Sequence, residues 1–220
     1  AATCHWAESW WTGHPRGHYR GGMPALLWCG LVGTAGFVLT FLVDGATRPG
    51  YRPTYHAVSA LATGDRGWVQ TTNFLACGVL ITLGGVGVGD ATGSLLLGAA
   101  IVVWGLALVA SGVWSMDPVR GYPPGTPAGD PEELSRAHDL HDKAGVVVFL
   151  ALPVSAAIAA FVLDGAWRWL SVAAAVLTVA LLALFVRAWE RDAPGTGVVQ
   201  RAMIITGWVW LGGLCWHLLT

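Results

Sequence analysis

The sequence predicts an all-α fold, an integral membrane bundle of about six transmembrane helices. Hydrophobic residues make up 55% of the chain and charged residues only 11%, whereas soluble domains carry about 25% charged residues. Several uncharged apolar runs approach or reach the ~20 residues that a helix needs to cross the hydrocarbon core of a bilayer. The runs show no residue-by-residue alternation of polarity, so a membrane β-barrel is excluded.

The chain begins with a segment that does not fit this pattern. Residues 1–22 are polar and rich in His, Trp and Gly, and they lack the continuous apolar core of a cleavable signal peptide. Met23 then opens a long apolar run, as a natural start would. We expect residues 1–22 to be a disordered extension or not part of the native protein, and residues 23–220 to form one six-helix transmembrane domain.

Six runs are expected to span the membrane, and each is apolar on all sides, as lipid surroundings require. Glycine and alanine recur within them, which favours close helix packing rather than a wide pore. In chain order the runs are Leu26–Val43, Trp68–Val88, Leu95–Trp114, Ala144–Leu163, Trp169–Val186 and Val198–Leu219.

The polar connections predict the orientation of the chain in a cell membrane. With six crossings, the loops 44–67, 115–143 and 187–197 share one face. The opposite face, residues 1–22 aside, has Arg168 as its basic residue. Because basic residues favour the inner side, the three loops are predicted to be cytoplasmic. Their basic residues are Arg48, Arg52, Arg66, Arg120, Arg136, Lys143, Arg187, Arg191 and Arg201.

The first polar loop contains a candidate site. His56 and Ser59 are three residues apart, so on a helix they would share a face and could act together on a substrate or a metal. The alternative is an interfacial turn in which both side chains satisfy neighbouring backbone groups. Gln70 and Asn73 repeat the spacing inside the next run, where their amides need partners from other helices.

The second polar loop contributes the other candidate residues. Asp117 precedes a proline that ends the third span, and the Pro/Gly-rich stretch after it is either a lid or a rigid connector. His138, His141 and Asp142 would share a helix face at the start of the fourth span. They could bind a divalent metal ion, the only cofactor suggested, or carry out general acid/base chemistry.

These candidates fall on one predicted membrane face. We therefore predict a single polar site there, in which Arg201 pairs with Asp117, because an ionisable group at the membrane needs a partner. Most tryptophans fall at span ends and are expected to anchor the interface. Trp104, Trp208 and Trp210 lie deeper and could line an aromatic pocket. The predicted catalytic or binding residues are His56, Ser59, Asp117, His138, His141 and Arg201.

The same motifs resemble a bacterial family of multi-pass membrane proteins, catalogued as domain of unknown function nine-nine-eight. The resemblance covers nearly all of residues 23–220. It implies a compact all-helical membrane fold and no particular activity. The motifs that carry it are His56 with Ser59 and Leu61, the stretch 67–70 with Asn73, Phe74 and Gly78, Asp117-Pro118 with 121–125, the pair His138 and His141, and Gln200-Arg201.

Three functions remain open at this stage. The first is a membrane enzyme or binding protein for a lipid or isoprenoid-like molecule, with membrane lipids and an apolar small molecule as its partners; in it, Arg201 would pair with an anionic headgroup. The second is a small transporter or channel, although the span centres are almost free of charge. The third is a structural subunit of a membrane complex. The net charge of −1 gives no indication of a nucleic-acid partner.

Overall fold

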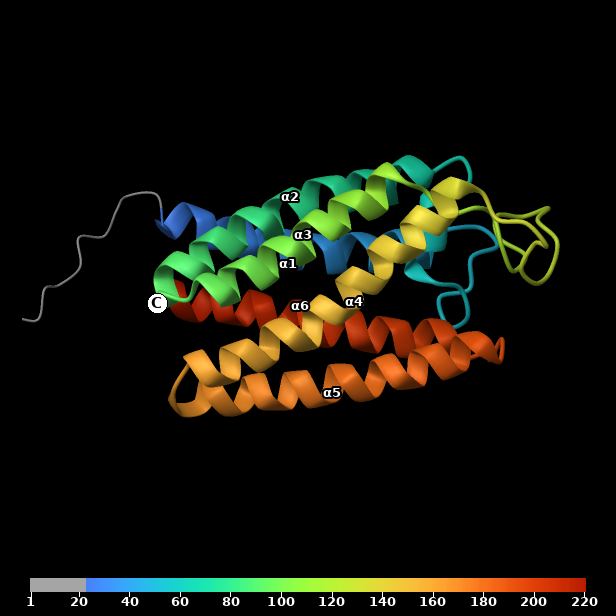
Figure 1. The fold of residues 1–220 in the computed structure, drawn as a ribbon. Coiled ribbons are helices and arrows are strands. Elements are labelled where there is room, and N and C mark those ends of the chain that lie inside the picture. Colours follow the sequence, from blue (N-terminus) through green and yellow to red (C-terminus); the bar gives the residue numbers. More distant parts are fainter. Residues whose placement is uncertain (1–22) are drawn as a thin grey trace, which may run out of the picture.

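The computed structural model describes residues 23–220 as a bundle of six α-helices with one short 3₁₀ helix, η1 (Figure 1). The described residues contain no strand, so the predicted all-α class is confirmed. The prediction for residues 1–22 concerns residues outside the described part of the chain. The elements are α1 (Met23–Thr47), η1 (Val58–Ala62), α2 (Gly67–Thr92), α3 (Leu95–Val113), α4 (Arg136–Val162), α5 (Gly165–Glu190) and α6 (Thr196–Leu219).

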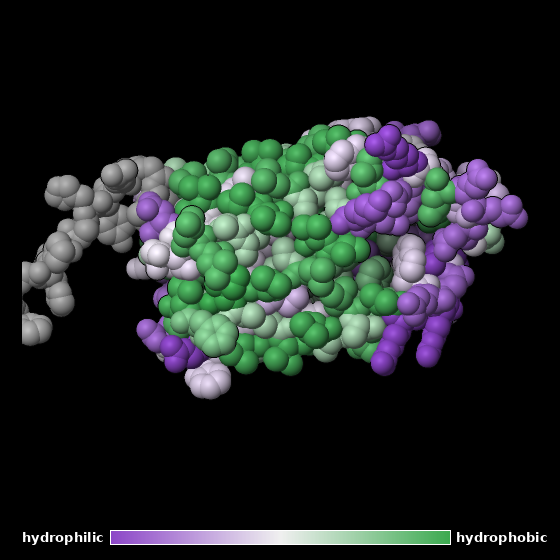
Figure 2. Space-filling model, in the orientation of Figure 1, coloured by the Kyte–Doolittle hydropathy of each residue, from purple (hydrophilic) through white to green (hydrophobic). Residues whose placement is uncertain are grey.

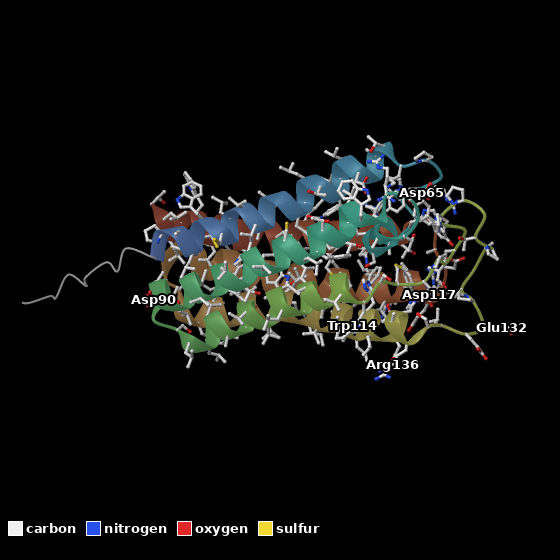
Figure 3. The ribbon with its side chains drawn as sticks, turned by 90° about the horizontal axis from the view of Figure 1, so that it is seen from above. Asp65, Asp90, Trp114, Asp117, Glu132 and Arg136 are labelled. Carbon is white, nitrogen blue, oxygen red and sulfur yellow. The ribbon has the colours of Figure 1, made fainter. Side chains whose placement is uncertain are left out.

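All six α-helices are long and apolar enough to cross a membrane. Figure 2 shows the consequence on the molecular surface, where a broad hydrophobic band covers the middle and hydrophilic residues gather at the ends. The long connections lie together at one end of the bundle (Figure 1), as six crossings require. In Figure 3 this end carries Asp65, Asp117, Glu132 and Arg136, whereas Asp90 lies at the opposite end.

The helices form a ring in chain order. Each helix packs on the next, and α6 closes the ring by packing on both α5 and α1. Glycine brings α2 and α3 especially close: a Cβ placed on Gly98 would lie 2.8 Å from Gly89 Cα and 3.0 Å from Gly85 O. The small-residue packing expected from the sequence therefore occurs in the first half of the ring.

Three helices extend further toward the polar end than the apolar runs indicated, and the first of them, α1, continues to Thr47. Helix α4 begins at Arg136, because the Ser135 hydroxyl caps it by accepting a hydrogen bond from His138 N at 3.1 Å. Helix α5 continues to Glu190. The predicted loops 115–143 and 187–197 are correspondingly shorter, because hydropathy marks only the part of a helix that lies in lipid.

Candidate functional site

A cavity of about 470 Å³ opens near the polar end of the ring. Its size falls within the ~300–1,000 Å³ range of small-molecule sites. All six α-helices and η1 contribute to its wall, and most of the contributing side chains are apolar or aromatic. The residues used below are Phe37, Ser59, Phe74, Ser111, His141, Asp142, Gly145, Val146, Leu150, Phe185, Val186, Trp189, Glu190, Gln200, Ile204 and Trp208.

The mouth of the cavity lies between α4 and α5. Val146 and Leu150 of α4 and Val186 of α5 line the cavity and are also exposed on the outer surface of the bundle. Asp142 and Glu190 form the rim nearest the loops. Figure 2 shows the surface hollowed where the hydrophobic band meets the hydrophilic end. The cavity is thus open toward the lipid-facing side of the molecule.

Aromatic rings form the deep wall. The Trp208 ring stacks on Phe37 at 4.9 Å between centroids, and Trp104 packs edge-on behind Trp208 at 4.8 Å. Phe74 packs against Phe37 and edge-on against the His141 ring. Of the three deep tryptophans suggested by the sequence, Trp208 lines the cavity, Trp104 supports it, and Trp210 donates to Ser171 elsewhere.

His141 presents one ring nitrogen to the backbone. Its Nδ1 lies 2.9 Å from Ser111 O and 2.8 Å from Trp114 O, at the end of α3. Both neighbours are acceptors, so Nδ1 carries the hydrogen and donates. In the neutral imidazole Nε2 is then an acceptor, and within the described residues it makes no hydrogen bond. His141 lines the cavity, so Nε2 is the nitrogen available to a ligand.

Gln200 lines the cavity from α6. Its Oε1 accepts a hydrogen bond from Val58 N at 2.8 Å, which fixes η1 against the helix. Its Nε2 amide makes no hydrogen bond within residues 23–220, although the side chain is buried. Ser59 lines the cavity from η1. Gln200, Ile204 and Trp208 are spaced by four residues and therefore share one face of α6.

A separate cluster at the start of α4 consists of Asp117, Ser135 and His138. The Asp117 carboxylate accepts from Ser135 N at 2.6 Å and from Ser135 Oγ at 2.8 Å, and these bonds lower the pKa of Asp117. His138 Nδ1 accepts from Asp117 N at 3.0 Å, and His138 Nε2 lies 3.4 Å from the Asp142 carboxylate. Both nitrogens of His138 are thus occupied, and the cluster closes the helix end.

His56 lies in the loop before η1, the 3₁₀ helix that contains Ser59. Its Nδ1 accepts from Arg52 N at 2.9 Å and its Nε2 lies 3.2 Å from Arg120 O. Its ring packs with those of Tyr51 and Tyr122. Burial lowers the pKa of His56, and the bond to Arg120 O partly opposes this effect. The turn interpretation therefore holds for His56, which satisfies backbone groups.

Arg201 does not pair with Asp117, contrary to the sequence-based prediction. Its guanidinium donates to the carbonyls of Pro53, His56 and Gly197 and to the Tyr51 hydroxyl. Burial raises the pKa of Tyr51 to about 12, so the phenol stays neutral beside the arginine. The first polar loop curls over the side chain of Arg201 and supplies the acceptors that were expected from a carboxylate.

The second polar loop is fastened at several points. Arg120 donates to both oxygens of Asp130, and its guanidinium lies 3.7 Å from the ring centroid of Trp189 on α5. Tyr122 accepts from Arg48 at 3.1 Å. These contacts are those of a rigid connector. They also place Trp189, which lines the cavity, beneath the loop.

The metal hypothesis gains no support from the geometry. Within residues 23–220, no group of three or more His, Cys, Asp or Glu side chains is placed to hold a metal ion. His138 and Asp142 face each other, while His141 turns Nδ1 toward the end of α3. His138 and Asp142 are one helical turn apart and face each other, but the polar atoms of the three residues do not converge.

The cavity is thus lined by some of the predicted site residues and by others that were not predicted as site residues. Ser59, His141 and Asp142 line it, whereas His56, Asp117, His138 and Arg201 fasten the surrounding loops and helix ends. Gln70 and Asn73 lie deeper, where Asn73 Nδ2 donates to Phe37 O across α1 at 3.1 Å. The additional lining residues include Phe74, which belongs to the motifs of the family resemblance, and Phe37, Ser111, Phe185 and Trp189, for which the hydrophobic runs gave no signal.

Comparison with known sequences identifies one family. The family described as "Protein of unknown function (DUF998)" matches residues 31–217, which include every helix in whole or large part. No curated protein and no solved structure matches the chain.

Proposed function

The chain belongs to the DUF998 family, whose description assigns no activity, and we propose that it binds a lipid or isoprenoid-like small molecule in the cavity between α4 and α5. The observation that carries this proposal is the cavity itself. Its wall is mainly apolar, its mouth lies on the lipid-facing side, and its free polar groups are few. This combination suits an amphiphile that enters from the bilayer.

The side chains at the cavity limit the chemistry that could follow ligand binding. His141 Nε2 is the one imidazole nitrogen there that is free in the described chain to exchange a proton with a ligand. A role for His141 as a general base requires the reacting proton within hydrogen-bond reach of Nε2. The other histidines near the polar end, His56 and His138, are engaged with backbone and carboxylate groups.

A blocking substitution tests the proposal. Gly145 lines the cavity, and a Cβ placed on it meets no atom within 4 Å. A side chain at position 145 therefore has room, and we expect the ring of Gly145→Phe to occupy part of the cavity; the substitution also replaces a poor helix former. Ala180→Phe adds the same ring on an exposed position of α5 that does not line the cavity, and it is the matched control.

Native mass spectrometry of the purified protein, titrated with amphiphiles that share one long acyl chain, provides the readout. We expect at least one of these probes to be retained at one equivalent by the wild-type protein and by Ala180→Phe, and lost from Gly145→Phe. Equal retention by all three proteins, or no stoichiometric retention by the wild type, would contradict the proposal.

A further inference from the structure

From the polar groups of the cavity we infer the chemical class of its ligand, which is a neutral amphiphile whose head carries hydroxyl or carbonyl oxygens, rather than a phosphate or an amine. The inference rests on the proposed function and specifies it further. It depends on four side chains in the cavity wall: Ser59, His141, Gln200 and Trp208.

The first observation is the hydrogen-bonding capacity that these side chains leave unused. Trp208 is 1% exposed, and its Nε1 has no partner in the described chain. Gln200 Nε2 is also without one, while its Oε1 is fixed by Val58 N. Buried donors without acceptors are costly and rare. The Nε1 of Trp208 is therefore a buried donor without an acceptor, and Gln200, which lies on the same face of α6, has an Nε2 that makes no hydrogen bond within the described residues.

The second observation is that an acceptor accompanies the donors. His141 donates through Nδ1 to the end of α3, which leaves Nε2 as an acceptor. The Ser59 hydroxyl can both donate and accept. A hydroxyl group satisfies such a mixed set because it also does both. A carbonyl oxygen further along the ligand would suit Trp208, two turns deeper on α6.

The third observation is the charge of the wall. The charged side chains that line the cavity are Asp142 and Glu190, both carboxylates at the rim. Among residues 23–220, no lysine or arginine lines it. The buried guanidinium of Arg120, which lies against the lining residue Trp189, is already bonded to Asp130 and to Trp189 O. A phosphate would thus find no cationic partner in the wall of the cavity.

An amine head is a weaker match. Asp142 already faces His138 Nε2 at 3.4 Å, and both rim carboxylates are exposed to solvent, where their attraction for a cation is screened. An ammonium group has no acceptor capacity. It would therefore leave the N–H groups of Gln200 and Trp208 unsatisfied. A neutral head with hydroxyl or carbonyl oxygens is the one that can pair with the polar side chains of the cavity.

The test compares three ligands that share an oleoyl chain: monooleoylglycerol, oleoyl lysophosphatidic acid and oleylamine. Affinities are measured by native mass spectrometry. We expect monooleoylglycerol to bind about tenfold or more tightly than either charged ligand, a difference of about 1.4 kcal/mol. Tighter or equal binding of a charged ligand overturns the inference but leaves the proposed function standing. Failure of all three to bind at one equivalent refutes the proposed function itself.

Variants identify the groups that the head uses. Trp208→Phe removes a donor that has no internal partner, and we expect about two- to tenfold weaker binding of monooleoylglycerol, the value of one net hydrogen bond. The control Trp210→Phe removes a donor that bonds Ser171 outside the cavity, and it should leave affinity unchanged.

Gln200→Glu keeps the oxygen that accepts from Val58 N and replaces the free amide by a carboxyl oxygen. We expect it to weaken monooleoylglycerol binding as Trp208→Phe does. The melting temperature of each variant confirms that the bundle is intact. Wild-type affinity in both Trp208→Phe and Gln200→Glu would overturn the inference.

Discussion

Three buried arginines hold the polar end together, and each does so through backbone carbonyls. Arg48 donates to the carbonyls of Leu61, Thr63 and Arg66, Arg120 to that of Trp189, and Arg201 to those of Pro53, His56 and Gly197. A loop placed over a membrane bundle has backbone acceptors that no helix satisfies, and a guanidinium has five donors. These three arginines therefore have a structural role.

Two Arg–Asp pairs with the same spacing allow a matched test of this role. Arg48 and Asp44 are both 3% exposed, whereas the side chains of Arg168 and Asp164 are 44% and 91% exposed. We expect Arg48→Gln to destabilise the protein by about 3–5 kcal/mol, because the buried carboxylate of Asp44 then keeps Arg66 as its one ionic partner among the described residues. Arg168→Gln should cost about 0.2–1 kcal/mol.

Thermal unfolding in detergent measures both effects on one scale. The melting temperature should fall clearly for Arg48→Gln and hardly at all for Arg168→Gln. Equal shifts for the two variants would show that the buried arginine does not fasten the loops.

The loop histidine His56 gives a pH-dependent prediction. Burial lowers its pKa below 6.5, so the unfolded chain takes up the proton more readily than the folded one. Its contribution to stability is therefore complete above about pH 6.5 and is lost as the pH falls below that value. The melting temperature of the wild type should decrease between about pH 7.5 and pH 5.5 by more than that of His56→Gln. Parallel pH profiles would contradict the assignment.

Part of the site followed from residue types and spacing, and part could not. The positions of His138 and Asp142 on one helix face were predictable from the helical period. Which nitrogen of each histidine faces a carbonyl was not, because it depends on where α3 and the loops end in space. The partner of Arg201 was missed for the same reason: its acceptors are main-chain oxygens, which every residue has.

The helices of the ring pack closely between α2 and α3 but leave open space between α4 and α5. The close approach at Gly98 brings α2 against α3, whereas Gly145 on α4 has open space where a side chain would stand. The cavity lies on the open side, between α4 and α5. Its position follows from where glycine permits contact and where it leaves a gap.

Alanine substitutions at these two glycines should have opposite effects. Gly98→Ala places a methyl group 2.8 Å from Gly89 Cα, and we expect it to destabilise the bundle by about 1–3 kcal/mol. Gly145→Ala meets no atom and should stabilise α4 by up to about 1 kcal/mol through helix propensity. Chemical denaturation of the two variants is the measurement. A stabilising Gly98→Ala would disprove the close packing of α2 on α3.

The helices themselves were predictable because long apolar runs have few alternatives in a bilayer. The polar extensions of the helices were less predictable. Arg136–Lys143 belongs to α4 because Ser135 caps the helix, and the end of α5 continues to Glu190 beyond the apolar run. Hydropathy reports the surroundings of a helix, while capping groups and loop contacts decide where it ends.

For the whole molecule, the position of the loops predicts its orientation. The long connections share one end of the bundle, and the basic residues there favour the cytoplasmic side. We expect an Ala128→Cys variant, in the loop after α3, to be protected from a membrane-impermeant maleimide in intact cells. Ala166→Cys, at the opposite end, should be labelled. The reverse pattern would invert the orientation and place the cavity mouth in the outer half of the membrane.

An experimental structure of the protein in a lipid nanodisc containing monooleoylglycerol tests the central claim most directly. We expect elongated density between α4 and α5, with its polar end beside Gln200 and His141 and its chain leaving between Val146 and Val186. A cavity closed by movement of Trp189 or Phe185, with lipid density only on the outer surface of the helices, would contradict the account.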